Sequence, residues 1–559
     1  MTSNTSSLQD PLQGHGPIEY VSRASSEAGK DIYARQVTND DVLAVRRKAL
    51  AEIDNAKFGW FHIKACLVAG IGFFTDSYDI FAINLCALIM GYVYYADAEG
   101  DAKNTTPTKI DMWIKGSTQL GCIVGQFFFG WLADRLGRKR IYGVELIIII
   151  VCTIGGSFAG MTARGLSVYW VLFIWRFVLG IGIGGDYPVS AIITSEFATT
   201  KNRGAMIAAV FAMQGFGIVA AAIVAIIVLA AFKGAVDKDQ LMLDYVWRII
   251  MGLGVVPGII ALYFRLTIPE TPRYTLDIEQ NAYRAARDVQ ATVGNNANKT
   301  KASKNDVEEE APLQPQTREN QVQKPTWGEF YRHFKKWKNF RVLMGTTVTW
   351  FALDVAFYGI NLNSSIILQA IGFSDKGTPY HELLKTTAGN IILNLLGTLP
   401  GYWVTVFTID RLGRRTIQFI GFTVLVILFC ILGFGYHKIL DKSVAGFVVL
   451  FTLAQFFQNF GPNTTTFIIP AEAFPTRFRS TCHGISAACG KVGAVVAQLG
   501  FFQLKNRGGK NKFIPQLIQI FALFMLIGLI FTWFVPETKG KSLEELSEGD
   551  DDERAGETR

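Results

Sequence analysis

Long apolar stretches alternate with short polar ones along most of the chain. Twelve of the apolar stretches reach the length of about 20 residues that an α-helix needs to cross the ~30 Å hydrocarbon layer of a bilayer. They span residues 61–95, 112–133, 141–162, 168–195, 205–232, 246–266, 341–371, 386–407, 416–436, 444–470, 482–503 and 513–535. The pattern predicts an all-α membrane protein with twelve transmembrane helices.

Charged residues gather in the loops between the predicted spans. Only 18% of the 559 residues are charged and 50% are hydrophobic, which disfavours a soluble globular domain. The loops after the second, fourth, eighth and tenth spans are basic, so the positive-inside rule predicts that both termini and the connection 267–340 are cytoplasmic. The segment 504–512 is also basic but falls on the predicted outer side, as an exception to the rule. Because loop topology explains the net charge of +8, we expect no nucleic-acid partner.

The spans divide evenly around the long central connection. We predict an N-terminal cytoplasmic segment 1–55, a six-helix half 56–266, a central loop 267–340, a second six-helix half 341–535 and a cytoplasmic tail 536–559. The polar part of the loop, about 290–325, is predicted to be a linker. After it, aromatic and basic residues alternate at helical spacing from Trp327 to Lys338. This pattern fits a helix in the headgroup plane, or one packed on the underside of the bundle.

The two halves repeat a set of charged motifs at one offset. Asp134 to Asp410, Glu196 to Glu472 and Arg203 to Arg479 are each 276 residues apart. The repeat indicates two pseudo-symmetric halves. An Asp beside a Gly-Arg turn can join neighbouring helix ends by charge-assisted hydrogen bonds in one conformation and release them in another. The predicted gating residues are Asp134, Arg135, Arg138, Glu196, Arg203, Asp410, Arg411, Arg414, Glu472 and Arg479.

Three further motifs lie inside the spans: Thr75-Asp-Ser-Tyr-Asp79, Gly184-Gly-Asp-Tyr-Pro188 and Asn459-Phe-Gly-Pro-Asn-Thr-Thr-Thr466. With the repeated motifs they resemble the major facilitator superfamily over roughly residues 55–540, and within it the inorganic phosphate:proton symporters of fungi and plants. The resemblance implies a twelve-helix secondary transporter that exposes a central site alternately to each side. It also implies a plasma-membrane location.

Six ionisable side chains fall within the predicted spans: Asp76, Asp79, Arg176, Asp186, Asp354 and Lys491. Each costs ~2.5–3.5 kcal/mol at a helix centre, so function is the default explanation. Ion pairing between helices is the alternative, and it is as good an explanation for Arg176, which could neutralise Asp186 or Asp79. The resemblance places Asp76, Asp79 and Asp186 in a proton path, together with Asp354.

The repeat aligns polar residues of the two halves at matching depth. Subtracting 276 places Asp354 between Asp76 and Asp79, and Lys491 next to Gln214. One lysine among neutral donors suits a compact tetrahedral oxyanion, and Asp354, once protonated, becomes a further donor. Proton and anion would then bind cooperatively. The predicted phosphate site, which the resemblance also implies, is Tyr187, Gln214, Trp350, Asp354, Tyr358, Asn463 and Lys491.

Glycines also mark the fourth and tenth spans. Gly180, Gly182, Gly184 and Gly185 are expected to loosen the fourth span, and Gly461-Pro462 the tenth, at a site where a cavity can satisfy the backbone. For Gly180 and Gly182, close helix packing through small residues explains the pattern equally well.

The leading hypothesis is uptake of inorganic phosphate by proton symport. More than one membrane carboxyl predicts more than one proton per phosphate and an inward positive current. A carrier of phosphate esters such as glycerophosphodiesters, and a phosphate-sensing receptor, are the alternatives. We expect no enzyme, metal or cofactor, since the sequence has no nucleophile–base cluster, no zinc spacing and no Gly-Lys-Ser/Thr phosphate loop. The oligomeric state is left open.

Overall fold

The computed structural model describes residues 58–97, 103–160, 167–266, 326–373 and 378–543, together with Ala51, Asp54, Glu99, Arg273, Glu545 and Leu546. Every regular element in these ranges is helical. The linker 290–325, nearly all of the N-terminal segment 1–55 and the part of the tail after residue 546 fall outside the described residues.

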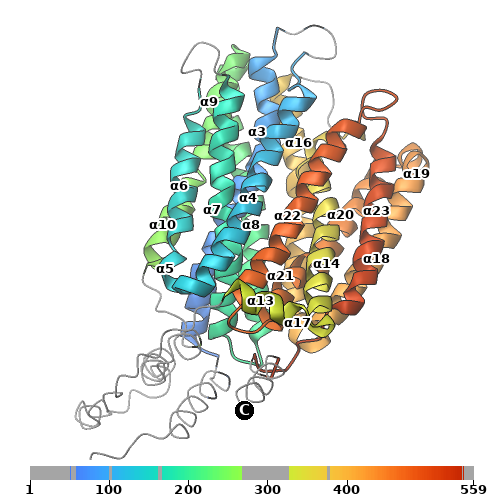
Figure 1. Ribbon diagram of the computed structural model, residues 1–559. Coiled ribbons are helices and arrows are strands. Elements are labelled where there is room, and N and C mark those ends of the chain that lie inside the picture. Colours follow the sequence, from blue (N-terminus) through green and yellow to red (C-terminus); the bar gives the residue numbers. More distant parts are fainter. Residues whose placement is uncertain are drawn as a thin grey trace, which may run out of the picture. The chain divides into compact units, whose positions relative to one another are not determined.

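The first half of the bundle runs from blue to green in Figure 1. Its helices are α3 (Trp60–Tyr94), α4 (Thr108–Leu136), α5 (Arg138–Ile141), α6 (Val144–Ser157), α7 (Val168–Phe197), α8 (Arg203–Val236), the 3₁₀ turn η2 (Gln240–Met242), α9 (Leu243–Gly252) and α10 (Val255–Arg265). The short helices α9 and α10 together occupy the predicted sixth span.

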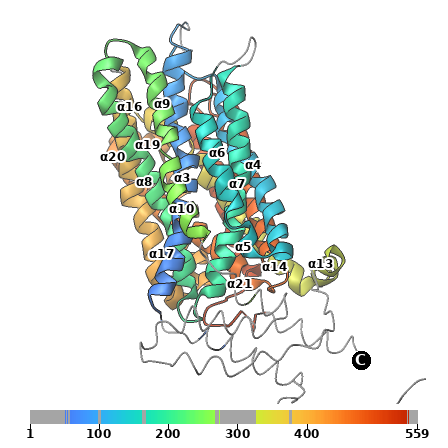
Figure 2. The same ribbon diagram turned by 90° about the vertical axis from the view of Figure 1, so that its left-hand side faces the viewer.

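The second half runs from yellow to red in the same view. It comprises α13 (Trp327–Phe334), α14 (Trp337–Asn361), α15 (Ser364–Ala370), α16 (Pro379–Leu393), the π-helical turn η4 (Asn394–Thr398), α17 (Leu399–Leu412), α18 (Arg414–Phe434), α19 (Tyr436–Lys442), α20 (Val444–Asn459), α21 (Pro462–Ala473), α22 (Arg479–Leu504), α23 (Ile514–Phe531) and the 3₁₀ turn η5 (Thr532–Phe534). All of the long helices run roughly side by side (Figures 1 and 2).

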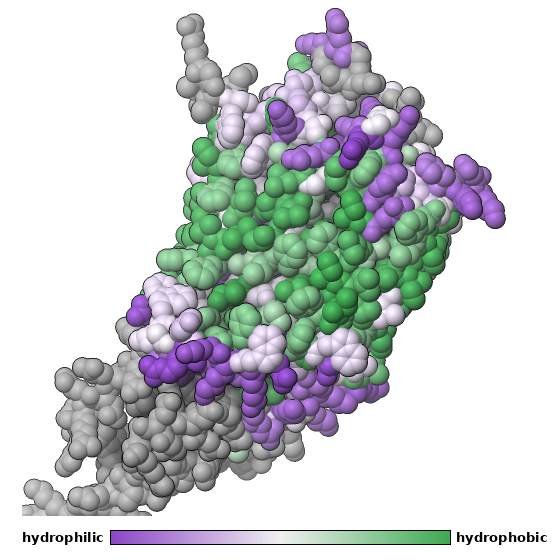
Figure 3. Space-filling view, turned by 45° about the vertical axis from the view of Figure 1, so that its right-hand side comes forward, coloured by the Kyte–Doolittle hydropathy of each residue, from purple (hydrophilic) through white to green (hydrophobic). Residues whose placement is uncertain are grey.

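All twelve predicted stretches fall on helix, and ten helical segments in the described part of the chain are long and apolar enough to cross a bilayer. The two remaining predicted stretches correspond to α4 and α6, which do not reach this combination of length and apolar character. Figure 3 shows a broad apolar belt between polar rims on one face of the bundle, as expected where lipid tails meet the side chains. The prediction of an all-α membrane protein is confirmed.

The expected loosening of the fourth span is wrong, because α7 continues without a break through all four glycines and Pro188. The glycines instead allow close contact with neighbouring helices. A Cβ atom on Gly180 would lie 2.1 Å from the carbonyl oxygen of Thr118, and one on Gly184 would lie 2.5 Å from that of Cys122. Backbone contact between α4 and α7 therefore explains these residues.

The tenth span is interrupted where the sequence indicates. Helix α20 ends at Asn459 and α21 begins at Pro462, which has no backbone N–H to continue the helix. The side chains remain aligned across the break, since Asn463 Nδ2 donates to Asn459 Oδ1 at 2.7 Å. The break therefore releases backbone groups beside the centre of the bundle.

The two halves meet along two helix pairs. Helix α4 packs along α22, and α8 packs along α17, so each pair joins one half to the other. Between these pairs lie α3, α7, α14 and α21, which carry most of the predicted site residues. We name the end of the bundle at which α13 lies the α13 end, and the end that carries Asn104 and Lys510 the opposite end.

Candidate functional site

Lys491 lies at the centre of the predicted site and is almost completely buried. It extends from α22, and its Nζ donates to Asp354 Oδ2 at 2.9 Å and to the Tyr358 hydroxyl at 3.0 Å, both on α14. The ammonium group also lies 4.4 Å from the ring centre of Tyr358 and 5.0 Å from that of Tyr187. One buried lysine thus has a carboxylate as its counter-ion and two aromatic rings around it.

A chain of neutral hydrogen bonds connects the two halves next to this lysine. Gln214 Nε2 on α8 donates to the Tyr187 hydroxyl at 2.8 Å, and Asn463 Nδ2 on α21 donates to the Tyr402 hydroxyl at 2.8 Å. Tyr402 in turn donates to Gln214 Oε1 at 3.4 Å. Polar groups from α7, α8, α17 and α21 therefore meet at one place.

Aromatic rings enclose these polar groups. Phe467 stacks on Phe211 with 4.3 Å between ring centres, and Phe73 lies 5.0 Å from Tyr187. Trp350 is buried beside Phe467, and a Cβ atom on Gly490 would lie 2.5 Å from its ring. Water is thereby largely excluded, which strengthens every electrostatic interaction at the site.

The structure brings together all seven residues predicted for substrate binding. It adds Tyr402, which the sequence analysis missed. The same offset of 276 aligns Tyr402 with Gln126, another buried polar residue within a span, and that alignment could have identified it. The arrangement offers one cation, one carboxyl group and several neutral donors, which suits a small oxyanion.

Asp186 belongs to a separate buried cluster in the first half. Asp186 pairs with Arg265 at 2.6 Å, and the same guanidinium lies 3.4 Å from Glu145 and over the ring of Tyr142. All three charged groups are buried. Arg265 and Glu145 were not among the predicted residues, and their positions near the ends of predicted spans hid their depth.

Asp76 lies beside this cluster on α3. No donor among the described residues bonds to its carboxyl group, and its charged neighbours include Asp186 and Arg265. Two carboxyl groups so close together in a dry interior repel each other unless a proton is shared between them. The geometry is therefore compatible with a protonatable pair.

Of the two partners expected for Arg176, Asp186 is wrong, because it pairs with Arg265. Arg176 instead interacts with Asp79. Its guanidinium donates to the backbone carbonyls of Asp79 and Ile114 at 3.3 and 3.4 Å. The Asp79 carboxylate accepts a hydrogen bond from Thr153 at 2.8 Å. Arg176 thus ties α7 to the backbone of α3 and α4.

Two aspartates, one from each half, make equivalent contacts that connect the halves at the α13 end. Asp134 at the end of α4 accepts from the backbone N–H groups of Ser480 and Thr481, at the start of α22, at 3.2 and 2.7 Å. Asp410 at the end of α17 accepts from Gly204 and Ala205, at the start of α8, at 3.2 and 2.9 Å. A carboxylate at a helix N-terminus interacts favourably with its exposed N–H groups and dipole.

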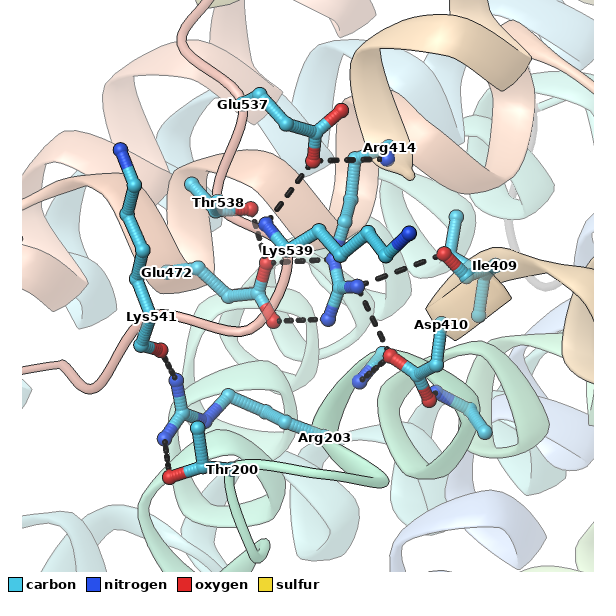
Figure 4. A network of polar contacts seen from close by, with 12 residues as sticks. Thr200, Arg203, Ile409, Asp410, Arg414, Glu472, Glu537, Thr538, Lys539 and Lys541 are labelled. Carbon is cyan, nitrogen blue, oxygen red and sulfur yellow. Dashed lines mark hydrogen bonds and ion pairs between the residues drawn. The ribbon is translucent and has the colours of Figure 1, made fainter. Parts of the chain in front are cut away.

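Arginine–glutamate pairs extend each of these junctions. Arg138 lies 3.2 Å and Arg479 3.5 Å from Glu196, while Arg414 lies 2.8 Å from Glu472 (Figure 4). Arg203 donates to the backbone carbonyl of Lys541 at 3.0 Å. Eight of the ten predicted gating residues belong to these junctions.

The remaining two gating residues lie elsewhere. The guanidinium of Arg135 lies 5.0 Å from the ring centre of Trp131, and the exposed Arg411 contributes its backbone carbonyl to Lys539. The turns after them are tight: Gly137 and Gly413 have φ values of 95° and 97°, which favour glycine. The predicted turn geometry is therefore present in both halves, although among the described residues Arg135 and Arg411 make no contact that cross-links them.

Side-chain hydrogen bonds without arginine connect the halves toward the opposite end. Asn84 Nδ2 on α3 donates to Ser364 Oγ at 2.8 Å, and the Tyr92 hydroxyl donates to Glu382 at 2.7 Å. A cavity of about 40 Å³ lies next to the Asn84–Ser364 contact, lined by apolar side chains and by polar ones that include Asn84, Asn361 and Gln455. The central site is thus closed off by contacts on both sides.

A helical bundle of two related halves, which holds a central polar site between junctions at both ends, defines a membrane transporter of the alternating-access class. Residues 65–549 match the family described as Sugar (and other) transporter, and the chain belongs to this family of the major facilitator superfamily.

The chain is 47% identical over 519 residues to the repressible high-affinity phosphate permease of Neurospora crassa, covering 90% of this chain and 89% of the relative. It is 48% identical over 529 residues to an inorganic phosphate transporter of Saccharomyces cerevisiae, covering 91% and 88%. The fold resembles that of a major facilitator proton:xylose symporter, with a TM-score of 0.64, 19% identity and coverage of 87% and 98%.

Proposed function

We propose that this chain takes up inorganic phosphate together with protons by exposing the Lys491 site alternately to the two sides of the membrane. The names of the relatives from Neurospora crassa and Saccharomyces cerevisiae support the substrate. The chemistry of the site supports it independently, because a sugar would not require a buried lysine.

The Lys491–Asp354 ion pair is the observation that carries the proposal. With Asp354 ionised, the lysine is neutralised within the protein at 2.9 Å and has little to offer an anion. Protonation of Asp354 would free Lys491 for phosphate and turn the carboxyl group into a donor. Proton and phosphate would then favour each other's binding, which is the coupling that symport requires.

The second carboxyl cluster supports transfer of more than one proton. Asp76 lies beside the Asp186–Arg265 pair, in the same half as Tyr187. A proton shared by Asp76 and Asp186 could move during the cycle without passing through the phosphate site. Two protons per H₂PO₄⁻ would carry net charge inward and use the membrane potential, worth ~2.3 kcal/mol per charge per 100 mV.

For the orientation, we propose that the α13 end faces the cytoplasm of a cell-surface membrane, with both termini on that side. The basic loops next to the gating motifs support this orientation. A single cysteine in place of Asn104, at the opposite end, should react with an impermeant maleimide added outside intact cells. Reaction only after permeabilisation would reverse the orientation.

The function is tested by uptake of labelled phosphate into proteoliposomes under an imposed pH gradient. Asp354→Asn should still bind phosphate, because the amide remains a donor, but should fail to accumulate it. Lys491→Ala should lose binding, because the anion would be left unpaired in a dry site. Lys505→Ala, which removes a lysine near the far end of the same helix, should transport normally. Full accumulation by Asp354→Asn, or stronger inhibition of wild-type uptake by glycerol phosphate esters than by phosphate itself, would contradict the proposal.

A further inference from the structure

Helix α13 and the start of α14 form an elbow at the rim of the bundle (Figures 1 and 2). Thr326 caps α13 through a reciprocal pair of bonds with Glu329 at 3.2 and 3.3 Å. Lys335 and Lys336 then lead directly into α14 at Trp337. The elbow is therefore a well-defined element, and it lies where the membrane-spanning part of α14 begins.

One face of α13 packs against the bundle. Phe330 and Phe334 lie 5.7 and 6.1 Å from Phe478 and Phe474, and Arg477 pairs with Glu329 at 3.0 Å. Partial burial acts to raise the pKa of Glu329, but the Thr326 backbone bond and Arg477 outweigh it, so the pKa is lowered and the pair stays charged. These contacts hold α13 on the second half.

The start of the same helix contacts the first half. Trp327 stacks on Phe127 and Trp131 of α4, with 6.1 and 6.4 Å between ring centres. Phe127 is half-exposed on the apolar outer surface of α4. Helix α13 therefore spans the junction between α4 and α22, beside the contacts that Asp134 makes with Ser480 and Thr481.

The other face of the elbow is exposed, aromatic and basic. Tyr331 and Trp337 are 72% and 59% exposed, and Phe340 is also exposed. Five exposed cations lie among these rings or directly after them: Arg332, Lys335, Lys336, Lys338 and Arg341. Glu329, the carboxylate in α13, is already paired with Arg477, so the positive charge of this face is not offset from within the helix.

The position of this face selects its partner. Trp337, Phe340 and Arg341 share the outward side of the first turn of α14, where the apolar belt gives way to a polar rim like that in Figure 3. Aromatic rings prefer the headgroup level of a bilayer, and lysine and arginine extend from there to phosphate groups. Clustered cations at this depth attract anionic lipids.

We propose that the α13–α14 elbow binds the headgroups of anionic phospholipids through Arg332, Lys335, Lys338 and Arg341. Bound lipid holds α13 across the junction of the two halves and so favours the conformation in which the α13 end is closed. The effect on transport rests on the proposed function, whereas lipid binding does not.

Binding is tested by titrating the full-length protein in detergent with dioctanoyl phosphatidylserine or dioctanoyl phosphatidylcholine. We expect at least tenfold tighter binding of phosphatidylserine. The variant Arg332→Gln/Lys335→Gln/Lys338→Gln/Arg341→Gln should reduce this preference to less than twofold. The control Lys238→Gln/Arg507→Gln/Lys510→Gln/Lys512→Gln removes the same charge from exposed positions at the opposite end and should keep it. Equal losses in both variants, or no preference in the wild type, would overturn the proposal.

The proposed effect of lipid on the conformation is measured separately, through the reactivity of Cys482. Cys482 is buried in one cluster with Phe334, Phe474 and Phe478, so its reaction with maleimide requires α13 to move away. With Cys482 as the sole cysteine, phosphatidylserine should slow its modification severalfold in the wild-type elbow and leave the rate unchanged in the four-residue variant. Slowing of equal size in both proteins would show that lipid does not act through the elbow. This measurement holds even if phosphate is not the substrate.

Discussion

The hydroxyl of Tyr402 connects Gln214 on α8 with Asn463 on α21, two residues that we propose bind phosphate. It receives a bond from Asn463 and donates one to Gln214. Tyr402→Phe should therefore weaken phosphate binding by roughly threefold to tenfold, because a neutral hydrogen bond contributes about 0.5–1.5 kcal/mol. The half-saturating phosphate concentration for uptake measures this effect. Tyr436→Phe removes a hydroxyl from another buried tyrosine and should leave it unchanged.

Lys505 follows the last residue of α22, outside the span, and has an unusual titration. Burial lowers its pKa to about 8, Asp111 opposes this decrease, and Lys115 and Lys510 reinforce it. Below about pH 8 the charged amine carries its full burial penalty. Between that pH and the unfolded pKa of about 10.4, the folded state alone is deprotonated, so stability rises with pH.

A melting experiment in detergent checks this sign. Between pH 7.5 and 9.5 the melting temperature of the wild type should rise relative to that of Lys505→Met. The substitution should also raise the melting temperature at pH 7, because it removes a buried charge. A pH profile identical in the two proteins would show that Lys505 is not desolvated.

Individual site residues were predictable when they lay deep inside an apolar stretch. Asp354 and Lys491 were conspicuous because a charge within such a stretch is costly. Arg265 and Glu145 lie near span ends, where a charge costs little if it reaches water, and the sequence gives no measure of their depth. Only the packing of α6, α7 and α10 shows that they are buried.

At the scale of the elements, close approach of α4 and α7 depends on glycine. A Cβ atom on Gly180 would meet the backbone oxygen of Thr118 at 2.1 Å, and backbone atoms cannot move aside without shifting the helix. Gly180→Ala should destabilise the protein by roughly 1–3 kcal/mol, the usual range for overpacking.

A second glycine of the same helix pair provides the control. A Cβ atom on Gly116 in α4 would meet nothing within 4 Å, so Gly116→Ala should be neutral or stabilise the helix by up to about 1 kcal/mol. Thermal unfolding of the purified variants measures the difference. If Gly180→Ala were as stable as Gly116→Ala, α4 and α7 would lie further apart than the 2.1 Å Cβ distance requires.

Hydropathy located every span but not the breaks within them. The glycines of α7 and Gly461-Pro462 look alike as flexible sequences, yet only the second interrupts a helix. A glycine keeps its N–H and can stay in a helix that neighbours pack tightly, whereas Pro462 removes a donor outright. Pro188 stays within α7, so proline alone does not decide the outcome either.

For the whole molecule, the two ends are held by different chemistry. Carboxylates, arginines and helix N-termini join the halves at the α13 end. Toward the opposite end the neutral side chains of Asn84 and Ser364 join them, together with the bond from Tyr92 to Glu382. The repeat in the sequence predicted the charged end, because its motifs recur at one offset. It could not predict the neutral contacts, which have no counterpart in the repeat.

This difference predicts which substitutions open the α13 end. Asp134→Asn and Asp410→Asn should each weaken one junction to a similar extent, because each replaces a carboxylate at a helix N-terminus by a neutral amide. A loss of about 0.5–2 kcal/mol per junction would make the double variant open more than either single variant. The modification rate of a sole Cys482 measures opening, and it should rise in the order wild type, single variants, double variant. Asn84→Ala, which loosens the opposite end, should lower it. If Asp134→Asn alone gave the full increase, the junction between α4 and α22 would control opening by itself, and the junction between α8 and α17 would contribute nothing.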